Sequence, residues 1–223
     1  MNWKVYYKLF FFFIFFCAQL SAIELPFEIF RVNTEEKMVF LTFDDGPHPE
    51  YTSQIVAILN QYNVPAIFFL IGESVQKFPL QSKLIVDSGF NIGNHTFSHV
   101  NINRLTQKSL LKEVAKSQLV IWETLGVLPH YFRPPYGRLQ ERYKHYLKRH
   151  FKHIIRWSVD PQEWRGEVKP KMIIKDVIKV LEPGCIVLLH ESEKTIKLLP
   201  ALIKQVRRQG YVFKSFDDIL LEN

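Results

Sequence analysis

The sequence predicts a single α/β domain in which helices cover a largely parallel sheet. Short apolar runs with strand character alternate along the chain with longer helical patterns, and this alternation is typical of parallel strands joined by helical crossovers. No linker, low-complexity tract or clear repeat interrupts it. A chain of 223 residues also corresponds to one domain with a sizeable core. Alternation alone does not distinguish a barrel from a doubly wound sheet.

The predicted strands and helices alternate strictly along the chain. Seven strand-like apolar runs lie at residues 39–43, 66–71, 90–92, 132–133, 154–159, 185–189 and 211–213. Six helical patterns lie between them, near residues 51–61, 80–88, 106–125, 142–149, 172–181 and 195–208.

Residues 1–22 differ from the rest of the chain. Lys4 and Lys8 precede a short apolar run, residues 9–18, and Ala22 offers a small residue at a possible cleavage point. This pattern predicts a secretory signal peptide, and the alternative is an uncleaved anchor. The run is shorter than the roughly twenty residues of a spanning helix. We therefore expect export to the periplasm, the cell envelope or the medium, with membrane contact only through an uncleaved leader.

The remainder of the chain is expected to divide into a leading segment, residues 23–37, and the main domain, residues 38–223. The formal charge is +7 at pH 7, and removing Lys4 and Lys8 with the leader leaves +5. A moderately basic surface suits an anionic polymer or envelope. No nucleic-acid-binding motif or basic tail is present, so the sequence does not indicate a nucleic-acid partner.

Two adjacent carboxylates, Asp44 and Asp45, follow the strand-like run 39–43 and precede the Gly46–Pro47 turn. Neighbouring side chains on a strand point to opposite faces, so these two carboxylates are expected to do different work. One could bind a metal ion while the other handles a proton.

Two histidines, His95 and His99, could complete such a site. Their spacing predicts that one helical turn, capped by Asn94, places both imidazoles on the same side. Two histidine nitrogens and a carboxylate oxygen form a common catalytic zinc site with a fourth position open to water. The alternative is that both histidines merely fill a loop, but their combination with Asp44 and Asp45 favours the metal site.

Three further segments occur in order after these residues: 131–137 (YFRPPYG), 157–164 (WSVDPQEW) and 184–190 (GCIVLLH). Together with TFDDGP and HTFSH they resemble the five ordered motifs of the polysaccharide deacetylases, the NodB-homology carbohydrate esterases of family four. The resemblance covers residues 38–191. It implies an irregular β/α barrel of about seven strands and a metal-dependent deacetylase.

The resemblance also implies roles for individual residues. Asp45, His95 and His99 would hold a divalent ion, with zinc the favoured metal, whose bound water is the nucleophile. Asp44 would be the general base, and Arg133 would favour its charged form.

The same resemblance makes His190 the general acid that protonates the leaving amine, with Asp160 pairing with it to keep it oriented. The backbone N–H of Tyr136 would help to hold the oxyanion. Four residues are expected to contact the substrate: Pro134, Tyr136, Trp164 and Leu188. Glu163 departs from the family pattern, which usually has aspartate before this tryptophan.

Three classes of function follow from these observations. The first is removal of N-acetyl groups from a polymeric amino sugar, such as the N-acetylglucosamine of peptidoglycan. The second is an O-acetyl carbohydrate esterase with the same metal site, and the third is a non-enzymatic glycan-binding envelope protein. Glycosidase chemistry is disfavoured, because Asp44 and Asp45 diverge whereas two glycosidase carboxyls must flank the scissile bond.

Overall fold

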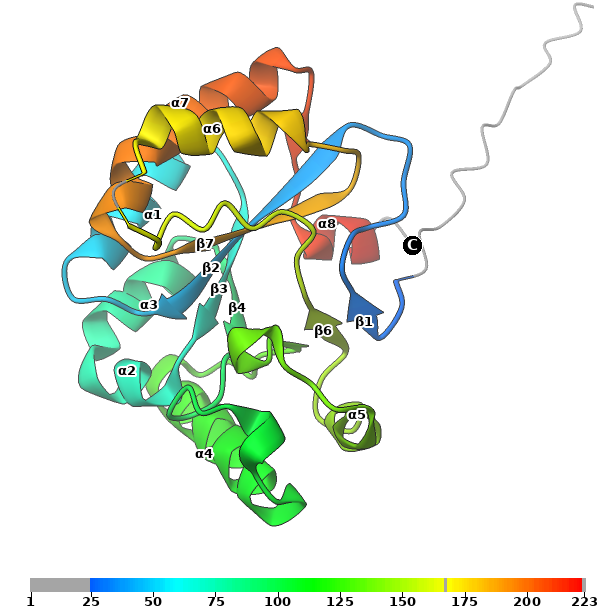
Figure 1. Cartoon of the computed structure of the whole chain (residues 1–223). Coiled ribbons are helices and arrows are strands. Elements are labelled where there is room, and N and C mark those ends of the chain that lie inside the picture. Colours follow the sequence, from blue (N-terminus) through cyan, green and yellow to red (C-terminus); the bar gives the residue numbers. More distant parts are fainter. Residues whose placement is uncertain (1–24, 167, 222–223) are drawn as a thin grey trace, which may run out of the picture.

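The computed structural model describes residues 25–166 and 168–221, which form one curved parallel sheet with helices on its outer face (Figure 1). The predicted signal peptide or anchor, residues 1–22, lies outside the described residues. In the described part of the chain, no helix has both the length and the apolar character needed to cross a membrane.

The sheet contains eight strands among the described residues, and all of their pairings are parallel. They are β1 (Glu28–Ile29), β2 (Met38–Gly46), β3 (Ala66–Leu70), β4 (Asn91–Asn94), β5 (Tyr131–Phe132), β6 (His153–Ile155), β7 (Cys185–His190) and β8 (Val212–Phe213). Their order is β1-β6-β5-β4-β3-β2-β7, and β8 pairs with the start of β2. The carboxyl ends of the strands therefore meet on one side of the sheet.

The two ends of this strand order approach each other. Isolated bridges join Arg31 to Cys185 and Val159 to Val187, and the Val32 N–H donates to the carbonyl of Gly184 over 3.0 Å. The sheet thus curls into an irregular barrel whose ladder is interrupted between β7 and the strands β1 and β6. This confirms the predicted α/β class.

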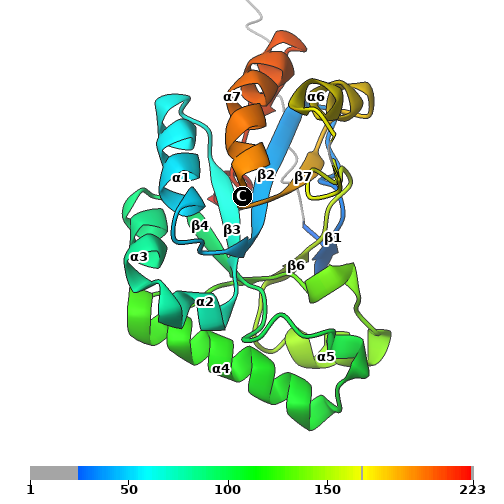
Figure 2. The ribbon, with the colours of Figure 1, turned by 60° about the vertical axis from the view of Figure 1, so that its left-hand side comes forward.

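Helices cover the outside of the barrel. They are α1 (Tyr51–Gln61), α2 (Gly72–Lys77), α3 (Pro79–Asp87), α4 (Gln107–Leu125), α5 (Glu141–Leu147), α6 (Pro170–Lys179), α7 (Glu193–Arg208) and α8 (Phe216–Leu221). Neighbours contact one another in the order α6, α7, α1, α3 and α4 (Figure 2). Polar caps begin two of them: the side chains of Thr106 and Ser192 accept hydrogen bonds from Ser109 N–H and Thr195 N–H.

The alternation of side chains along β2 separates two apolar clusters. Leu41 and Phe43 point outward and pack with residues of the covering helices, whereas Phe40 points into the barrel. The inner cluster includes Phe216 of α8, whose ring centroid lies 4.6 Å from that of Phe40. Further along the same inner face comes Asp44, at the carboxyl end of the strand. Because side chains alternate along β2, the Asp44 carboxylate lies at the mouth of the barrel.

Each predicted strand has a counterpart in the structure, with shifted ends. The predicted strand 154–159 is the least accurate, because β6 ends at Ile155 and only Val159 rejoins the sheet. Strand β1 and the six-residue helices α2 and α8 were not predicted. Elements of two to six residues are too short to show a hydrophobic period.

Candidate metal and catalytic site

The predicted site residues converge at the carboxyl ends of neighbouring strands. Asp44 is aligned with His190 across β2 and β7. On the other side of β2, Gly46 pairs with Leu70 of β3, and Leu70 in turn pairs with Asn94 at the end of β4. His95 follows Asn94 directly. Parallel register therefore brings motifs that are far apart in the sequence to one mouth of the barrel.

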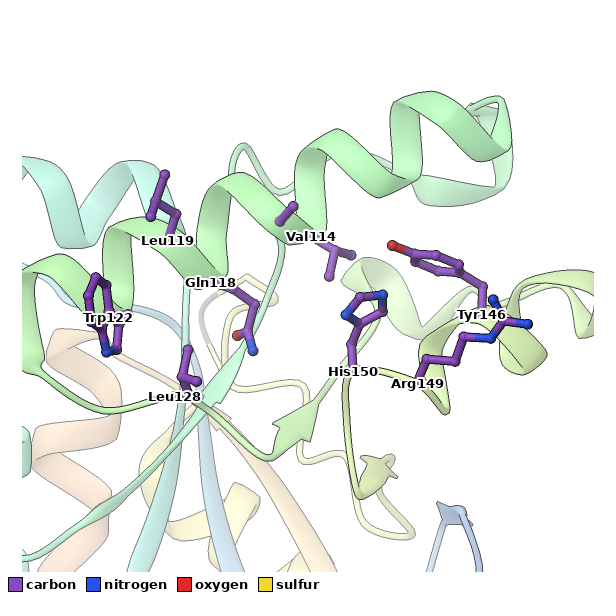
Figure 3. A pocket seen from close by; sticks show the side chains of 9 residues that line it. Val114, Gln118, Leu119, Trp122, Leu128, Tyr146, Arg149 and His150 are labelled. Carbon is purple, nitrogen blue, oxygen red and sulfur yellow. The ribbon is translucent and has the colours of Figure 1, made fainter.

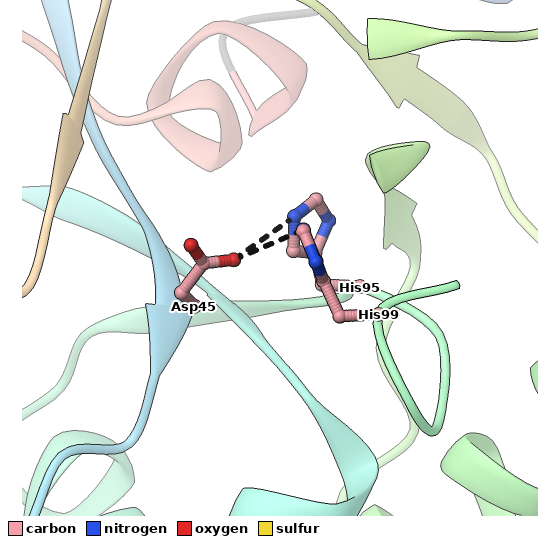
Figure 4. Close-up of side chains that lie close together, drawn as sticks. All are labelled: Asp45, His95 and His99. Carbon is pink, nitrogen blue, oxygen red and sulfur yellow. Dashed lines mark ion pairs between the residues drawn. The ribbon is translucent and has the colours of Figure 1, made fainter. Parts of the chain in front are cut away.

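Asp45, His95 and His99 form a compact group of possible metal ligands (Figure 4). Asp45 Oδ1 lies 3.5 Å from His95 Nε2 and 3.2 Å from His99 Nε2. Metal–ligand bonds of about 2.0–2.1 Å in a tetrahedral zinc site place donors about 3.3 Å apart. All three donor atoms lie within 4.8 Å of one another. The donor types and their separations thus fit a divalent ion such as zinc.

The protonation state of the two histidines also suits a metal. His95 Nδ1 lies 2.7 Å from the carbonyl oxygen of Arg133, which can only accept, so Nδ1 carries the proton. The lone pair of Nε2 is then free on the side that faces Asp45. Burial lowers the pKa of both His95 and His99, which favours the neutral imidazole that metals bind.

The prediction that one helical turn carries both histidines is wrong. Residues 95–100 form a loop in which Thr96 and His99 have positive φ angles of 66° and 54°. Asn94 does anchor this loop, as its Oδ1 accepts a hydrogen bond from Thr96 N–H over 2.8 Å. The left-handed residues, rather than a helical period, turn both imidazoles toward Asp45.

Helix α4 holds this loop through two residues that the sequence did not indicate. The Glu113 carboxylate accepts a hydrogen bond from Ser98 N–H over 2.9 Å. Gln118 Oε1 accepts one from the Asn94 amide over 3.0 Å. Both contacts join residues fifteen or more positions apart in the sequence, and nothing in the local pattern signals them.

Asp44 is held by a fully buried arginine. Arg133 Nη1 donates to Asp44 Oδ1 over 2.6 Å and to Thr42 Oγ1 over 2.9 Å. The remaining guanidinium nitrogens donate to backbone carbonyls, and the group stacks over the Phe69 ring at 4.1 Å. Asp44 Oδ2 faces His95 Nε2 at 3.6 Å. One carboxylate oxygen is thus paired with a fixed cation, while the other faces a possible metal ligand, His95.

His190 pairs with Glu163, not with Asp160 as predicted. Its Nδ1 lies 2.9 Å from Glu163 Oε1, which also accepts the backbone N–H of His190 over 2.6 Å. Asp160 instead accepts a hydrogen bond from Gln162 N–H within its own turn. Glu163 is fully buried, so the turn projects residue 163, rather than residue 160, toward β7.

This pairing decides the charge of His190. Burial opposes the imidazolium, but the hydrogen bond to Glu163 and the negative charges of Asp44, Glu163 and Asp45 outweigh it and raise the pKa of His190 to about 9. The ring is therefore protonated at neutral pH, as a general acid must be.

Glu163→Gln removes one of these charges and should lower the pKa of His190. An activity that needs the protonated ring is lost as pH rises through that pKa, so the alkaline limb of the kcat/KM profile should move to lower pH. We expect a shift of about one unit or more, the size that a nearby opposite charge produces. Profiles of wild type, Glu163→Gln and Asp160→Asn between pH 6 and 11 test this. An equal shift in both variants would contradict the assignment to Glu163.

The predicted substrate-contacting residues have different surroundings. Tyr136 is 60% exposed and its ring centroid lies 4.7 Å from that of His99. Trp164, 55% exposed, follows Glu163 directly. Leu188 is buried two residues before His190 on the same face of β7, and Pro134 is buried beside Arg133. Their contacts with substrate, and the oxyanion role of Tyr136 N–H, remain predictions.

Strained backbone gathers in the same segments. Six non-glycine residues among those described have positive φ angles, and five lie in the site motifs: Asp45, Thr96, His99, Tyr136 and Gln162. Such conformations cost free energy and concentrate at functional sites.

A groove lies elsewhere on the molecule. It encloses about 490 Å³ between α4 and the end of α5 (Figure 3). Its lining residues include Trp122, Leu128 and His150 but none of the possible metal ligands, and Gln118, which contacts Asn94 of the site, forms part of its wall.

The fold and the site together define an α/β-barrel protein with a candidate metal site of one aspartate and two histidines at the carboxyl ends of its strands. The chain belongs to the polysaccharide deacetylase family, whose sequence model matches residues 31–152.

Two relatives of known name illustrate the similarity. A peptidoglycan-N-acetylglucosamine deacetylase of Bacillus cereus is 35% identical over 180 residues, which cover 78% of this chain and 65% of that protein. The peptidoglycan-N-acetylmuramic acid deacetylase PdaC of Bacillus subtilis is 34% identical over 192 residues, which cover 86% of this chain and 40% of PdaC. The chain thus spans less than two thirds of the length of either relative.

Solved structures show the same fold. The Bc1960 peptidoglycan N-acetylglucosamine deacetylase superimposes with a TM-score of 0.82 at 32% identity, covering 86% of this chain and 92% of that one. BA3943 from Bacillus anthracis, a family pseudoenzyme, gives a TM-score of 0.83 at 28% identity, covering 88% and 70%. Because a pseudoenzyme shares the fold, activity has to be inferred from the site residues.

Proposed function

We propose that this protein is a metal-dependent hydrolase that removes N-acetyl groups from a polymeric amino sugar, and that zinc is its metal. The observation that carries the proposal is the assembly of three units at one mouth of the barrel. These are the Asp45, His95 and His99 donors, the Asp44–Arg133 pair and the Glu163–His190 pair. A non-enzymatic glycan-binding protein has no need of a buried carboxylate–arginine pair and a charged histidine beside three metal donors.

Asp45, His95 and His99 would hold the ion. A divalent metal ion supplies Lewis-acid polarisation of a carbonyl oxygen and makes a bound water more acidic. Asp44 would accept the proton of the attacking water through Oδ2, since Oδ1 is occupied by Arg133. The fixed guanidinium keeps this carboxylate oriented.

His190 would donate a proton to the nitrogen of the departing amine. Amines are poor leaving groups unless they are protonated, so amide hydrolysis needs an acid that is charged at working pH. Because His190 and Asp44 are aligned on neighbouring strands, both groups can reach one substrate amide. Glu163 would keep the imidazole oriented, and charged until it donates this proton.

The exposed rings of Tyr136 and Trp164 would form the walls of the glycan-binding groove, because aromatic faces bury the apolar faces of sugar rings. Leu188 and Pro134, both buried beside catalytic residues, would shape the pocket for the acetyl group. Tyr136 N–H would help to hold the oxyanion.

We propose peptidoglycan N-acetylglucosamine as the substrate, with the protein acting outside the cytoplasm. Residues 1–22 have the pattern of an export signal, and the basic chain would be attracted to anionic wall polymers. The names of the Bacillus relatives support peptidoglycan, one as an N-acetylglucosamine deacetylase and the other as an N-acetylmuramic acid deacetylase. Chitin-like oligomers and an exopolysaccharide of β-linked N-acetylglucosamine offer the same acetamide and are the competing substrates.

The test is to incubate zinc-loaded protein with insoluble peptidoglycan and, separately, with soluble N-acetylglucosamine oligomers. We expect acetate release and new free amines on the N-acetylglucosamine of the muropeptides. Activity confined to the soluble oligomers would refute the substrate assignment and leave the deacetylase intact. Faster release from O-acetylated than from N-acetylated glycans would favour the O-acetyl esterase instead. Tight zinc binding without any acetate release would favour a pseudoenzyme.

A further inference from the structure

Glu191, which directly follows His190 at the end of β7, has no part in the chemistry proposed above. Its Oε2 accepts hydrogen bonds from His48 N–H, over 3.0 Å, and from the Thr52 hydroxyl. Its Oε1 is buried and has no hydrogen-bond partner among the described residues. A buried carboxylate oxygen without a partner costs free energy, so this arrangement calls for a compensating role.

The Glu191 carboxyl group is packed against the residue that follows the metal ligand Asp45. A Cβ atom added to Gly46 would lie 2.0 Å from Glu191 Oε1 and 2.7 Å from Cδ. The Gly46 carbonyl accepts a hydrogen bond from Ile71 N–H over 2.9 Å. The turn 46–48 is therefore clamped between the end of β3 on one side and Glu191 on the other.

This turn determines where Asp45 points. Asp45 has a positive φ of 69°, a conformation that a residue other than glycine keeps only when its surroundings enforce it. The Thr52 hydroxyl also accepts a hydrogen bond from His48 N–H, over 2.8 Å, so the first turn of α1 joins the same network. The Glu191 carboxyl group thus joins strand β7, the turn after Asp45 and helix α1.

We propose that Glu191 is a positioning residue for the metal site. By holding the turn 46–48, it keeps the Asp45 carboxylate directed at His95 and His99. The proposal rests on the proposed function, because it assumes that these three residues bind the metal.

The first test compares Glu191→Ala with Glu191→Gln. Loss of the clamp should weaken zinc binding about 10- to 100-fold, the usual effect of removing a group that orients a ligand. Glutamine should retain most of the affinity, since its amide oxygen can accept the same two hydrogen bonds. Burial raises the pKa of Glu191 to about 7, so a neutral side chain is a close substitute. Glu193→Ala, an exposed carboxylate two residues away, is the matched control.

Zinc dissociation constants are measured by competition with a chromophoric chelator, and Tm values are measured on the metal-free proteins. The constant is taken on folded protein, so a loss of stability alone does not alter it. If Glu191→Ala does not fold, Thr52→Val removes one of the two donors to the carboxylate and should weaken zinc binding in the same direction.

A double-mutant cycle with Gly46→Ala tests the contact from the other side. The three atoms nearest to the added Cβ all belong to Glu191, so this methyl group should displace the carboxylate and weaken zinc binding. In a Glu191→Ala background the same methyl group meets no carboxylate and should have little further effect. Such non-additivity is the signature of a direct coupling.

Three results would overturn the proposal while leaving the proposed function in place. They are equal zinc affinity in Glu191→Ala and Glu193→Ala, a Glu191→Gln variant as weak as Glu191→Ala, and additive effects in the cycle. Wild-type protein that binds no zinc would contradict the metal-dependent function itself, and the role of Glu191 with it.

Discussion

His95→Ala and His99→Ala are each expected to abolish tight zinc binding and deacetylation together. Either change leaves two of the three donors, and a site with two protein ligands no longer competes with water for the ion. Asp45→Ala should have the same result, because Asp45 Oδ1 lies 3.5 Å from His95 Nε2 and 3.2 Å from His99 Nε2 and is the third donor of the group. Elemental analysis of the purified variants, with acetate release in added zinc, measures both effects.

His130→Ala is the matched control, because His130 is exposed and belongs to none of the donor groups of the described structure. It should retain full zinc stoichiometry. Circular dichroism of His95→Ala is needed as well, since His95 is buried and hydrogen-bonded to the Arg133 carbonyl. Full zinc occupancy in folded His95→Ala or His99→Ala would show that the metal site is elsewhere.

The part of this site that strand geometry governs could be predicted from the sequence. The period of two along β2 predicts different surroundings for Asp44 and Asp45, and their side chains are 5% and 43% exposed. The positive φ of Asp45 departs from the regular strand, however, and both carboxylates lie within 3.6 Å of His95 Nε2. Alternating strands and helices predict a parallel sheet, which brings the carboxyl ends of β2, β4, β5 and β7 together. These conclusions depend only on local pattern and on register.

The part that loops govern could not be predicted in the same way. The four-residue spacing of His95 and His99 predicts a helical turn, but two left-handed residues and hydrogen bonds donated to side chains of α4 produce the observed loop. The prediction of Asp160 as the partner of His190 failed for a related reason. The Asp160 carboxylate accepts a hydrogen bond within its own turn, and only the path of residues 160–163 shows that Glu163 reaches the imidazole. Long-range contacts of this kind leave no periodic signal in the sequence.

Asp44→Asn is expected to separate proton transfer from metal binding. The amide cannot accept the proton of the attacking water, so kcat should fall about a hundredfold or more while Asp45, His95 and His99 remain in place. The change also leaves the buried Arg133 cation without its carboxylate, and removing one partner of a buried ion pair typically destabilises a protein by about 3–5 kcal/mol. Turnover must therefore be measured well below the Tm of the variant.

Thr42→Val is the control for that second effect. It removes the other side-chain acceptor of Arg133 Nη1 but leaves the Asp44 carboxylate intact. If Asp44 acts as the base, Thr42→Val should lose stability with little loss of kcat, whereas Asp44→Asn should lose kcat at unchanged zinc stoichiometry. Near wild-type amide hydrolysis by Asp44→Asn would mean that another group accepts the proton. The buried Asp44–Arg133 pair would then serve only to hold the mouth of the barrel together.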